Sequence, residues 1–313
     1  MRKLLISGMV LMCTVSLAGA VSCGPEVVTF HDANLEAEVR EAIDKPEGDI
    51  YPSDLEGLVS LTAREMDITD LSGLEHCTNL TELVLISNQI SDLSPLAKLT
   101  KLQKLELSGN QVSDISVLAS LSDLTSLGLG GNQISDLSPL ANLTKLQWLG
   151  LATNQIKDIS PLADLNRLTM LDLNGNEISD ISALADLTEL VSLLLMFNQV
   201  SDLSPLANLT ELTYLDLPFN RITDITPLAS LTNLTTLNLM GSPDGNQIED
   251  ITPLASLTKL SKLRLWNNQI SDIGPLMRFA NLDTLWIVEG NPLNEESVNV
   301  YIPQLKKRGV DVR

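Results

Sequence analysis

The chain has 313 residues with 40 acidic and 20 basic side chains, which give a formal net charge of −20 at neutral pH. Only 3% of the residues are aromatic, and no cluster of basic residues is visible in the sequence. A surface of this charge repels nucleic acids and anionic membrane surfaces, so we expect no nucleic-acid partner.

Residues 1–22 are typical of an export signal, since two basic residues precede an apolar run that ends in small side chains. Residues 19–23 (GAVSC) resemble a bacterial lipobox, in which Cys23 becomes the lipidated first residue of a membrane-anchored lipoprotein. Alternatively, cleavage after Ala20 releases a secreted protein, or the apolar run remains as a membrane anchor. We therefore predict an exported protein of the cell envelope, whose residues 23–29 form a short tether.

Cysteine usage agrees with a lipoprotein. Cys13 lies in the leader and Cys23 at the processing site, so Cys77 is the one cysteine left for the folded part. A disulfide framework is therefore excluded, even in an oxidising compartment. Cys77 occupies a place that leucine fills in later repeats, and we predict that it is a small buried core residue.

A helical cap is predicted for residues 30–57. Asp32 or Asn34 can begin a helix whose apolar face holds Leu35 and Val39. Such a cap would cover the first coil of the repeats that follow it.

Residues 58–291 consist of about ten repeats, most of them 22 residues long. Each full repeat is marked by an asparagine, at positions 88, 110, 132, 154, 176, 198, 220, 246 and 268. Asn246 follows its predecessor after 26 residues, because four extra residues in MGSPDGN form a predicted Pro-Asp-Gly turn. A regular period of this length indicates a solenoid.

Each repeat combines a strand with a short return segment. In LTKLQWLGL, Leu149 and Leu151 alternate in the manner of a strand that buries one face. Asn154 follows the strand, and its amide can satisfy backbone groups that would otherwise be buried unpaired. Asp158 and Pro161 are typical of the start of a short helical turn. Stacked coils then form a parallel sheet along one side of the solenoid.

Residues 292–313 are predicted to cap the far end, because the core of a terminal coil would otherwise face water. Asn294 can begin a helix that bears Val298, Ile302 and Leu305. No LPxTG sorting motif is visible, so we expect any membrane attachment at the N-terminus.

The consensus LxxLxLxxNxIxDLxPLAxL resembles the internalin-type leucine-rich repeat of bacteria, over roughly residues 58–291. The resemblance implies a leucine-rich-repeat solenoid, which is a curved rod with a concave parallel β-sheet. It further implies short 3-10 or loop segments on the convex side, small helical caps at both ends, and a protein-binding function. Internalins that are held to the cell wall by an LPxTG motif differ from this chain in their mode of attachment.

No constellation of residues indicates catalysis or metal binding. His31 and His76 fall in the cap and in the first, degenerate repeat, and Cys77 beside His76 is expected to point into the core. One Asp recurs in each repeat without a second carboxylate at ligand spacing, which favours capping over calcium binding. We predict no metal, no cofactor and no enzymatic activity.

The strand positions that the repeat does not fix face outward on the predicted sheet, and they hold all three tryptophans. Trp148 lies where other repeats carry Glu, Lys, Ser or Tyr, so the repeat alone does not explain it. In an aromatic-poor protein, tryptophans gathered on one exposed face indicate a binding surface. The candidate partner-binding residues are Trp148, Met170, Asp172, Met196, Phe197, Tyr214, Asp216, Phe219, Lys262, Arg264, Trp266 and Trp286. Phe197 and Phe219 either face the sheet edge or tuck into the core.

We therefore predict a monomeric, non-enzymatic, extracytoplasmic protein that recognises a protein partner on its concave face. The alternative is a cell-wall or glycan-binding protein whose aromatic rings stack on sugars. A sugar needs only one tryptophan with adjacent Asp or Asn side chains, such as Trp148 with Asp172 and Asn174. A third interpretation is that the aromatic residues only cover neighbouring strands and bind nothing.

Overall fold

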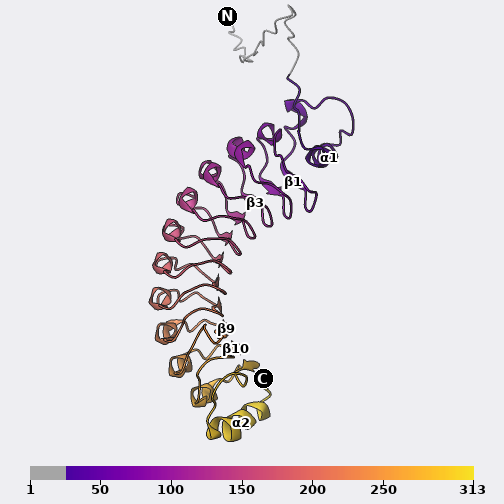
Figure 1. Cartoon of the computed structure of the whole chain (residues 1–313). Coiled ribbons are helices and arrows are strands. Elements are labelled where there is room, and N and C mark those ends of the chain that lie inside the picture. The colour runs from indigo at the N-terminus through magenta and orange to yellow at the C-terminus, as the bar shows by residue number, and fades with distance from the viewer. Residues whose placement is uncertain (1–25) are drawn as a thin grey trace, which may run out of the picture.

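The computed structural model describes residues 26–313, which form a single curved stack of coils (Figure 1). The predicted export signal and the candidate lipidation site Cys23 lie outside the described residues. Within residues 26–313, no helix is both long enough and apolar enough to cross a membrane.

Each coil contributes one short strand, and the twelve strands of residues 26–313 join in chain order in a single parallel sheet. The strands are β1 (Ser60–Thr62), β2 (Glu82–Val84), β3 (Lys104–Glu106), β4 (Ser126–Gly128), β5 (Trp148–Gly150), β6 (Met170–Asp172), β7 (Ser192–Leu194), β8 (Tyr214–Asp216), β9 (Thr236–Asn238), β10 (Lys262–Arg264), β11 (Thr284–Trp286) and β12 (Asp311–Val312). The repeats supply β1 to β11, where the sequence predicts about ten coils, because the degenerate first copy and the last copy both form a strand. The cap adds β12.

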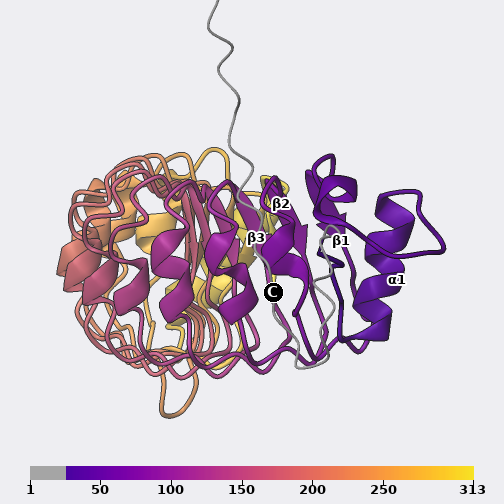
Figure 2. The ribbon, with the colours of Figure 1, turned by 90° about the horizontal axis from the view of Figure 1, so that it is seen from above.

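The register of the sheet follows the repeat. Leu149 pairs with Leu171 across 22 positions, and Leu237 pairs with Leu263 across 26 positions. The four inserted residues, 242–245, therefore leave the sheet unchanged and form the orange loop that projects beyond its neighbours in Figure 2.

Short 3-10 turns line the outer side of the arc, and the strands line its inner side (Figure 1). The turns are η1 (Pro52–Asp54), η2 (Leu74–His76), η3 (Ser94–Lys98), η4 (Ser116–Ser120), η5 (Ser138–Leu140), η6 (Ser160–Leu162), η7 (Ser182–Leu184), η8 (Ser204–Leu206), η9 (Thr226–Ser230), η10 (Thr252–Ser256) and η11 (Gly274–Arg278). Nine of these turns begin beside an Asp of the repeat, whose Oδ1 accepts the backbone N–H two residues later at 2.8 Å, as Asp158 does from Ser160. The predicted capping role of the Asp column is thus confirmed.

The repeat asparagines form a hydrogen-bonded ladder inside the coils. Nδ2 of Asn176 donates to the carbonyl oxygens of Leu151 and Leu173 at 3.0 Å, and its Oδ1 accepts the N–H of Ile156 at 3.0 Å. Equivalent bonds to the preceding coil recur at every repeat asparagine. Each amide therefore pairs backbone groups of two coils at once, as the sequence predicts.

The N-terminal cap contains α1 (Ala33–Ala42), which begins at Asp32 as predicted. The Asp32 carboxylate accepts the N–H groups of Asn34 and Leu35, and Leu35 and Val39 are buried on the apolar face of the helix. The cap thus covers the core of the first coil.

The C-terminal cap contains a π-helical turn, η12 (Ser297–Tyr301), followed by α2 (Ile302–Lys307). Ile302 and Leu305 are buried as predicted, but the expectation that Val298 shares their face is wrong, since it is 47% exposed. The wider π-helical turn shifts the register, so that Ser297 faces the core instead and bonds to the Ser271 carbonyl at 3.1 Å.

Candidate partner-binding surface

The outward side chains of β2 to β11, with the residues that follow each strand, form what we call the concave surface. On each strand the middle leucine is buried at an exposed fraction of 0%, whereas its neighbours face away from the core. The predicted orientation of the strands is correct, because Trp148, Trp266 and Trp286 are all partly exposed on this surface.

Trp148 lies flat on its own strand. A Cβ at Gly150 would come within 2.8 Å of the indole Cη2, so any larger residue there would require the ring to shift. The indole N–H donates to the Met170 sulfur at 3.0 Å, which joins β5 to β6. Trp148 therefore packs through one face and remains partly open to a partner through the rest of its surface.

Two carboxylates occupy the middle of the concave surface. Burial raises the pKa of Asp172, although the Asn174 N–H donates to its Oδ1 at 3.0 Å. Burial also raises the pKa of Asp216, whose side chain is only 7% exposed, and Asn238 and Arg264 oppose this shift. Burial therefore disfavours the charged form of the Asp216 carboxylate.

A second aromatic cluster lies at the C-terminal end. The rings of Trp266 and Trp286 stack with centroids 4.7 Å apart. The guanidinium carbons of Arg264 and Arg313 lie 4.6 Å and 5.7 Å from the Trp286 ring, within cation–π range. Lys262 is exposed beside them. The sequence singles out four of these residues but misses Arg313, which reaches the surface because β12 pairs with β11.

Phe197 and Phe219 lie at the strand-end edge of the concave surface, which settles one of the alternatives left open by the sequence. Their rings stack at 4.5 Å, and Phe197 is 54% exposed. Both backbones have a positive φ, of 55° and 57°, at a position where other coils carry glycine, as at Gly131 and Gly175. A bulky residue in this conformation destabilises the fold by about 1 kcal/mol or more. The stability of the fold therefore does not explain why two phenylalanines occupy this position.

The predicted residues fall into separate groups along the arc. Trp148 and Met170 form one, Phe197 and Phe219 with adjacent Met196 form another, and the cluster at the C-terminal end is the third. Strand β5 is six strands from β11, which is about 29 Å at ~4.8 Å per strand. No small ligand can touch all three groups.

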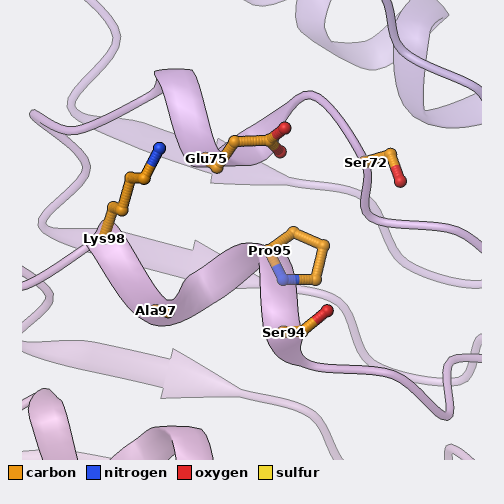
Figure 3. A pocket seen from close by; sticks show the side chains of 6 residues that line it. All are labelled: Ser72, Glu75, Ser94, Pro95, Ala97 and Lys98. Atoms are coloured by element: carbon orange, nitrogen blue, oxygen red, sulfur yellow. The ribbon is translucent and has the colours of Figure 1, made fainter.

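On the convex side, an open hollow lies between η2 and η3 (Figure 3). It is lined by Ser72, Glu75, Ser94, Pro95, Ala97 and Lys98. Nearby Cys77 is buried, and burial together with the Glu75 charge raises the pKa of its thiol to about 12. A nucleophile of this kind is inert, and residues 26–313 hold no cluster of His, Cys, Asp and Glu suited to a metal ion.

The sequence matches the family model described as leucine-rich repeats (2 copies) over residues 56–98, 100–142, 144–186, 166–208, 188–230 and 210–256. Among solved structures, the internalin InlF of Listeria monocytogenes is 34% identical with a TM-score of 0.78, over 95% of this chain and 92% of that one. This chain is an internalin-type leucine-rich-repeat protein. No curated protein matches the sequence.

Two further internalin-type structures from Listeria monocytogenes are similar. Internalin C2 is 38% identical with a TM-score of 0.57, over 75% of this chain and 94% of that one. The functional domain of InlJ is 26% identical with a TM-score of 0.75, over 90% of this chain and 59% of that one. InlJ includes a cysteine ladder, whereas the described part of this internalin-type chain has the single buried Cys77.

The family gives a coarse functional class. Leucine-rich-repeat proteins typically bind other proteins and are generally not enzymes, and internalins are bacterial surface or secreted proteins. A binding role is therefore the starting point for this internalin-type protein.

Proposed function

We propose that the protein is an exported, non-enzymatic binding protein that recognises a protein partner on its concave surface. The observation that supports this most is the spread of its exposed anchors. Trp148, the Phe197–Phe219 pair and the Trp266–Trp286 stack occupy ~29 Å of the arc, a span suited to a protein partner. A sugar ring would need only one of these groups.

The contact residues in this proposal are Trp148, Met170, Asp172, Met196, Phe197, Tyr214, Asp216, Phe219, Lys262, Arg264, Trp266 and Trp286. Attachment to the membrane through a lipid on Cys23 is part of the same proposal, since the leader ends in a lipobox-like sequence. The aromatic residues supply anchors and the charged residues supply selectivity.

The test uses the tryptophans as reporters in the chain from residue 24 onward, which retains all described strands and both caps. Its emission and iodide quenching are recorded alone, with extracellular protein fractions, and with cell-wall glycan. We expect the protein fractions, but not the glycan, to protect the indoles from iodide. Protection by the glycan alone would favour the sugar-binding alternative.

A variant with Trp148→Ala, Trp266→Ala and Trp286→Ala should retain its circular dichroism spectrum and capture at least tenfold less partner. Lys98→Ala on the convex side serves as the control and should capture normally, because its side chain lies on the opposite face. Undiminished capture by the folded triple variant would contradict the proposal.

A further inference from the structure

All buried side-chain polar atoms without a hydrogen-bond partner in residues 26–313 lie on one part of the concave surface. They are Oδ1 of Asp216, Nε of Arg264, and Nε1 of Trp266 and Trp286. Folded proteins leave few such atoms unpaired, because an unpaired buried donor has lost its water without compensation. Four unpaired atoms lie close together here: Asp216 is on β8, Arg264 on β10 and Trp286 on β11, and Trp266 follows β10. Such a group of atoms requires an explanation.

The chemistry of these atoms is unbalanced. Three of them are N–H donors and one is an acceptor, so the missing partner supplies mainly acceptors. Formal charge points the same way, since Lys262, Arg264 and Arg313 all lie at this end of the surface. Arg313 bonds to Asp311 at 2.9 Å. Arg264 interacts with the buried carboxylate of Asp216 but, like Lys262, forms no ion pair within 4.0 Å in the described residues.

The same place offers apolar surface next to the positive charges. Met240 occupies the position equivalent to Trp266 in the preceding coil, whose Gly241 N–H donates to the Trp266 carbonyl at 2.8 Å. The stacked Phe197–Phe219 pair follows along the strand-end edge. From β7 to β11 this surface spans four strand spacings, about 19 Å at ~4.8 Å each. An extended segment of about six residues covers that length.

We infer that Lys262, Arg264, Trp266, Trp286 and Arg313 form a subsite for an acidic, partly apolar segment of the protein partner. This inference rests on the proposed function and adds the chemistry of the ligand. A carboxylate of the partner pairs with Arg264 and accepts the indole N–H groups, while a backbone N–H of the partner donates to Asp216. Since neighbouring side chains cover the three donors, a small rotation of the indoles or of Arg264 accompanies binding. Tryptophan emission reports this rotation.

The test is selection of 12-residue random peptides from a display library against the immobilised chain from residue 24 onward, at low and at physiological salt. We expect the enriched sequences to combine Asp or Glu with Leu, Ile, Phe or Trp. Synthetic tryptophan-free peptides that match the enriched pattern should shift the emission of the protein. Their affinity should fall at least tenfold when Asp and Glu are replaced by Asn and Gln, and should weaken as salt rises.

The variants Arg264→Gln and Lys262→Gln should each weaken binding of these peptides, by about tenfold for Arg264→Gln. Arg313→Gln should also weaken binding, but by less than Arg264→Gln, because Asp311 already pairs with Arg313. The Arg313 side chain is 61% exposed, so its replacement does not disturb the core. Lys98→Gln on the convex side is the matched control and should bind normally. Enrichment of uncharged or basic peptides would overturn the inference. So would binding of the enriched acidic peptides by the Arg264→Gln and Lys262→Gln variants that is as tight as binding by the unsubstituted protein.

The outcomes also separate this inference from the proposed function. If uncharged peptides are enriched and lose binding to the triple tryptophan variant, the concave surface binds protein but the acidic subsite is wrong. If the enriched peptides bind the triple variant normally, both proposals fail. Protection of the tryptophans by polygalacturonate, with no enrichment of acidic peptides, would assign the subsite to an acidic glycan and overturn the peptide ligand.

Discussion

At the scale of single residues, several positions that depart from the repeat carry side chains with a cost to folding. Asn176 satisfies three backbone groups, as the repeat demands of it. Phe197 and Phe219, in contrast, adopt positive φ angles that glycine adopts at little cost. Asp216 buries a carboxylate with one oxygen unpaired. Strain and unpaired groups of this kind concentrate at functional sites, which is why the concave surface stands out from the coils that support it.

Asp216 allows a test of this cost through pH. Because burial raises its folded-state pKa above the ordinary value of 3.8, its charge opposes folding at neutral pH. Asp216→Asn should therefore raise the free energy of unfolding at pH 7, by on the order of 1 kcal/mol. The gain should shrink as pH falls through the raised folded-state pKa and vanish below pH 3.8. Urea unfolding across this pH range measures it.

The groups around Asp216 set the controls for that experiment. Tyr214 on the same strand, Asp172 on β6 and Arg264 on β10 face it, so Arg264 must stay unchanged. Asp180→Asn on the convex side should act in the opposite direction. Hydrogen bonds from Ser182 lower the pKa of Asp180, so its charge favours folding at neutral pH and that benefit is lost in acid. Equal behaviour of the two variants would contradict the argument.

At the scale of elements, the coils tolerate additions only where the core is not involved. The insert 242–245 lies between Gly241 and Asn246, and Asn246 still donates to the Leu217 carbonyl at 3.0 Å as a ladder residue. Removing the insert restores the order Met240-Gly241-Asn246-Gln247, which matches Asn174-Gly175-Asn176-Glu177 three coils earlier along the sheet. We expect this deletion to change the free energy of unfolding by less than ~1 kcal/mol, with a small gain from the shorter loop.

Urea unfolding followed by tryptophan emission measures the effect of the deletion. The matched control removes four residues, 222–225, from the neighbouring coil that has no insert. That control deletes the buried Ile222 and Ile225 and should destabilise the protein by several kcal/mol. A severe loss of stability in the insert deletion would show that the loop supports its coil.

Much of the fold follows from the sequence because the repeat fixes both the buried leucines and the ladder asparagines. The parallel sheet, the Asp caps and the start of α1 at Asp32 are all predictable in this way. The position of Val298 is not, because a π-helical turn shifts its register without any sequence signal.

The candidate surface is only partly predictable for a related reason. Counting strand positions assigns Trp148 to the outer face, but it does not show that the ring lies on Gly150. Arg313 is invisible to the repeat, since the cap and not a coil brings it beside Trp286. Side-chain packing between strands and the folding of the caps lie outside any 22-residue pattern.

At the scale of the whole molecule, the acidic side chains are distributed along a one-dimensional stack, in which each coil contacts only its neighbours. The nine capping aspartates form a row on the outer side of the arc. The hydrogen bonds from Ser182 lower the pKa of Asp180, and the charge of Asp158 one coil away partly opposes this lowering. Six Lys or Arg side chains pair with carboxylates in the described residues. The remaining acidic residues far outnumber them, since the chain from residue 24 onward has 18 basic and 40 acidic side chains.

Salt weakens both the attraction within the ion pairs and the repulsion between the acidic side chains. Because acidic residues far outnumber basic ones, the loss of repulsion should be the larger effect. Exposed ion pairs contribute ~0.2–1 kcal/mol each, and most acidic residues here have no cation beside them. At 0.5 M salt the Debye length is about 4 Å, shorter than the ~4.8 Å between coils, so the repulsion is largely screened. We therefore expect the urea midpoint to rise between 20 mM and 500 mM NaCl. KCl should act equally, since screening depends on ionic strength and not on the cation. A midpoint that stays constant or falls would mean that the six ion pairs outweigh the repulsion of the whole stack.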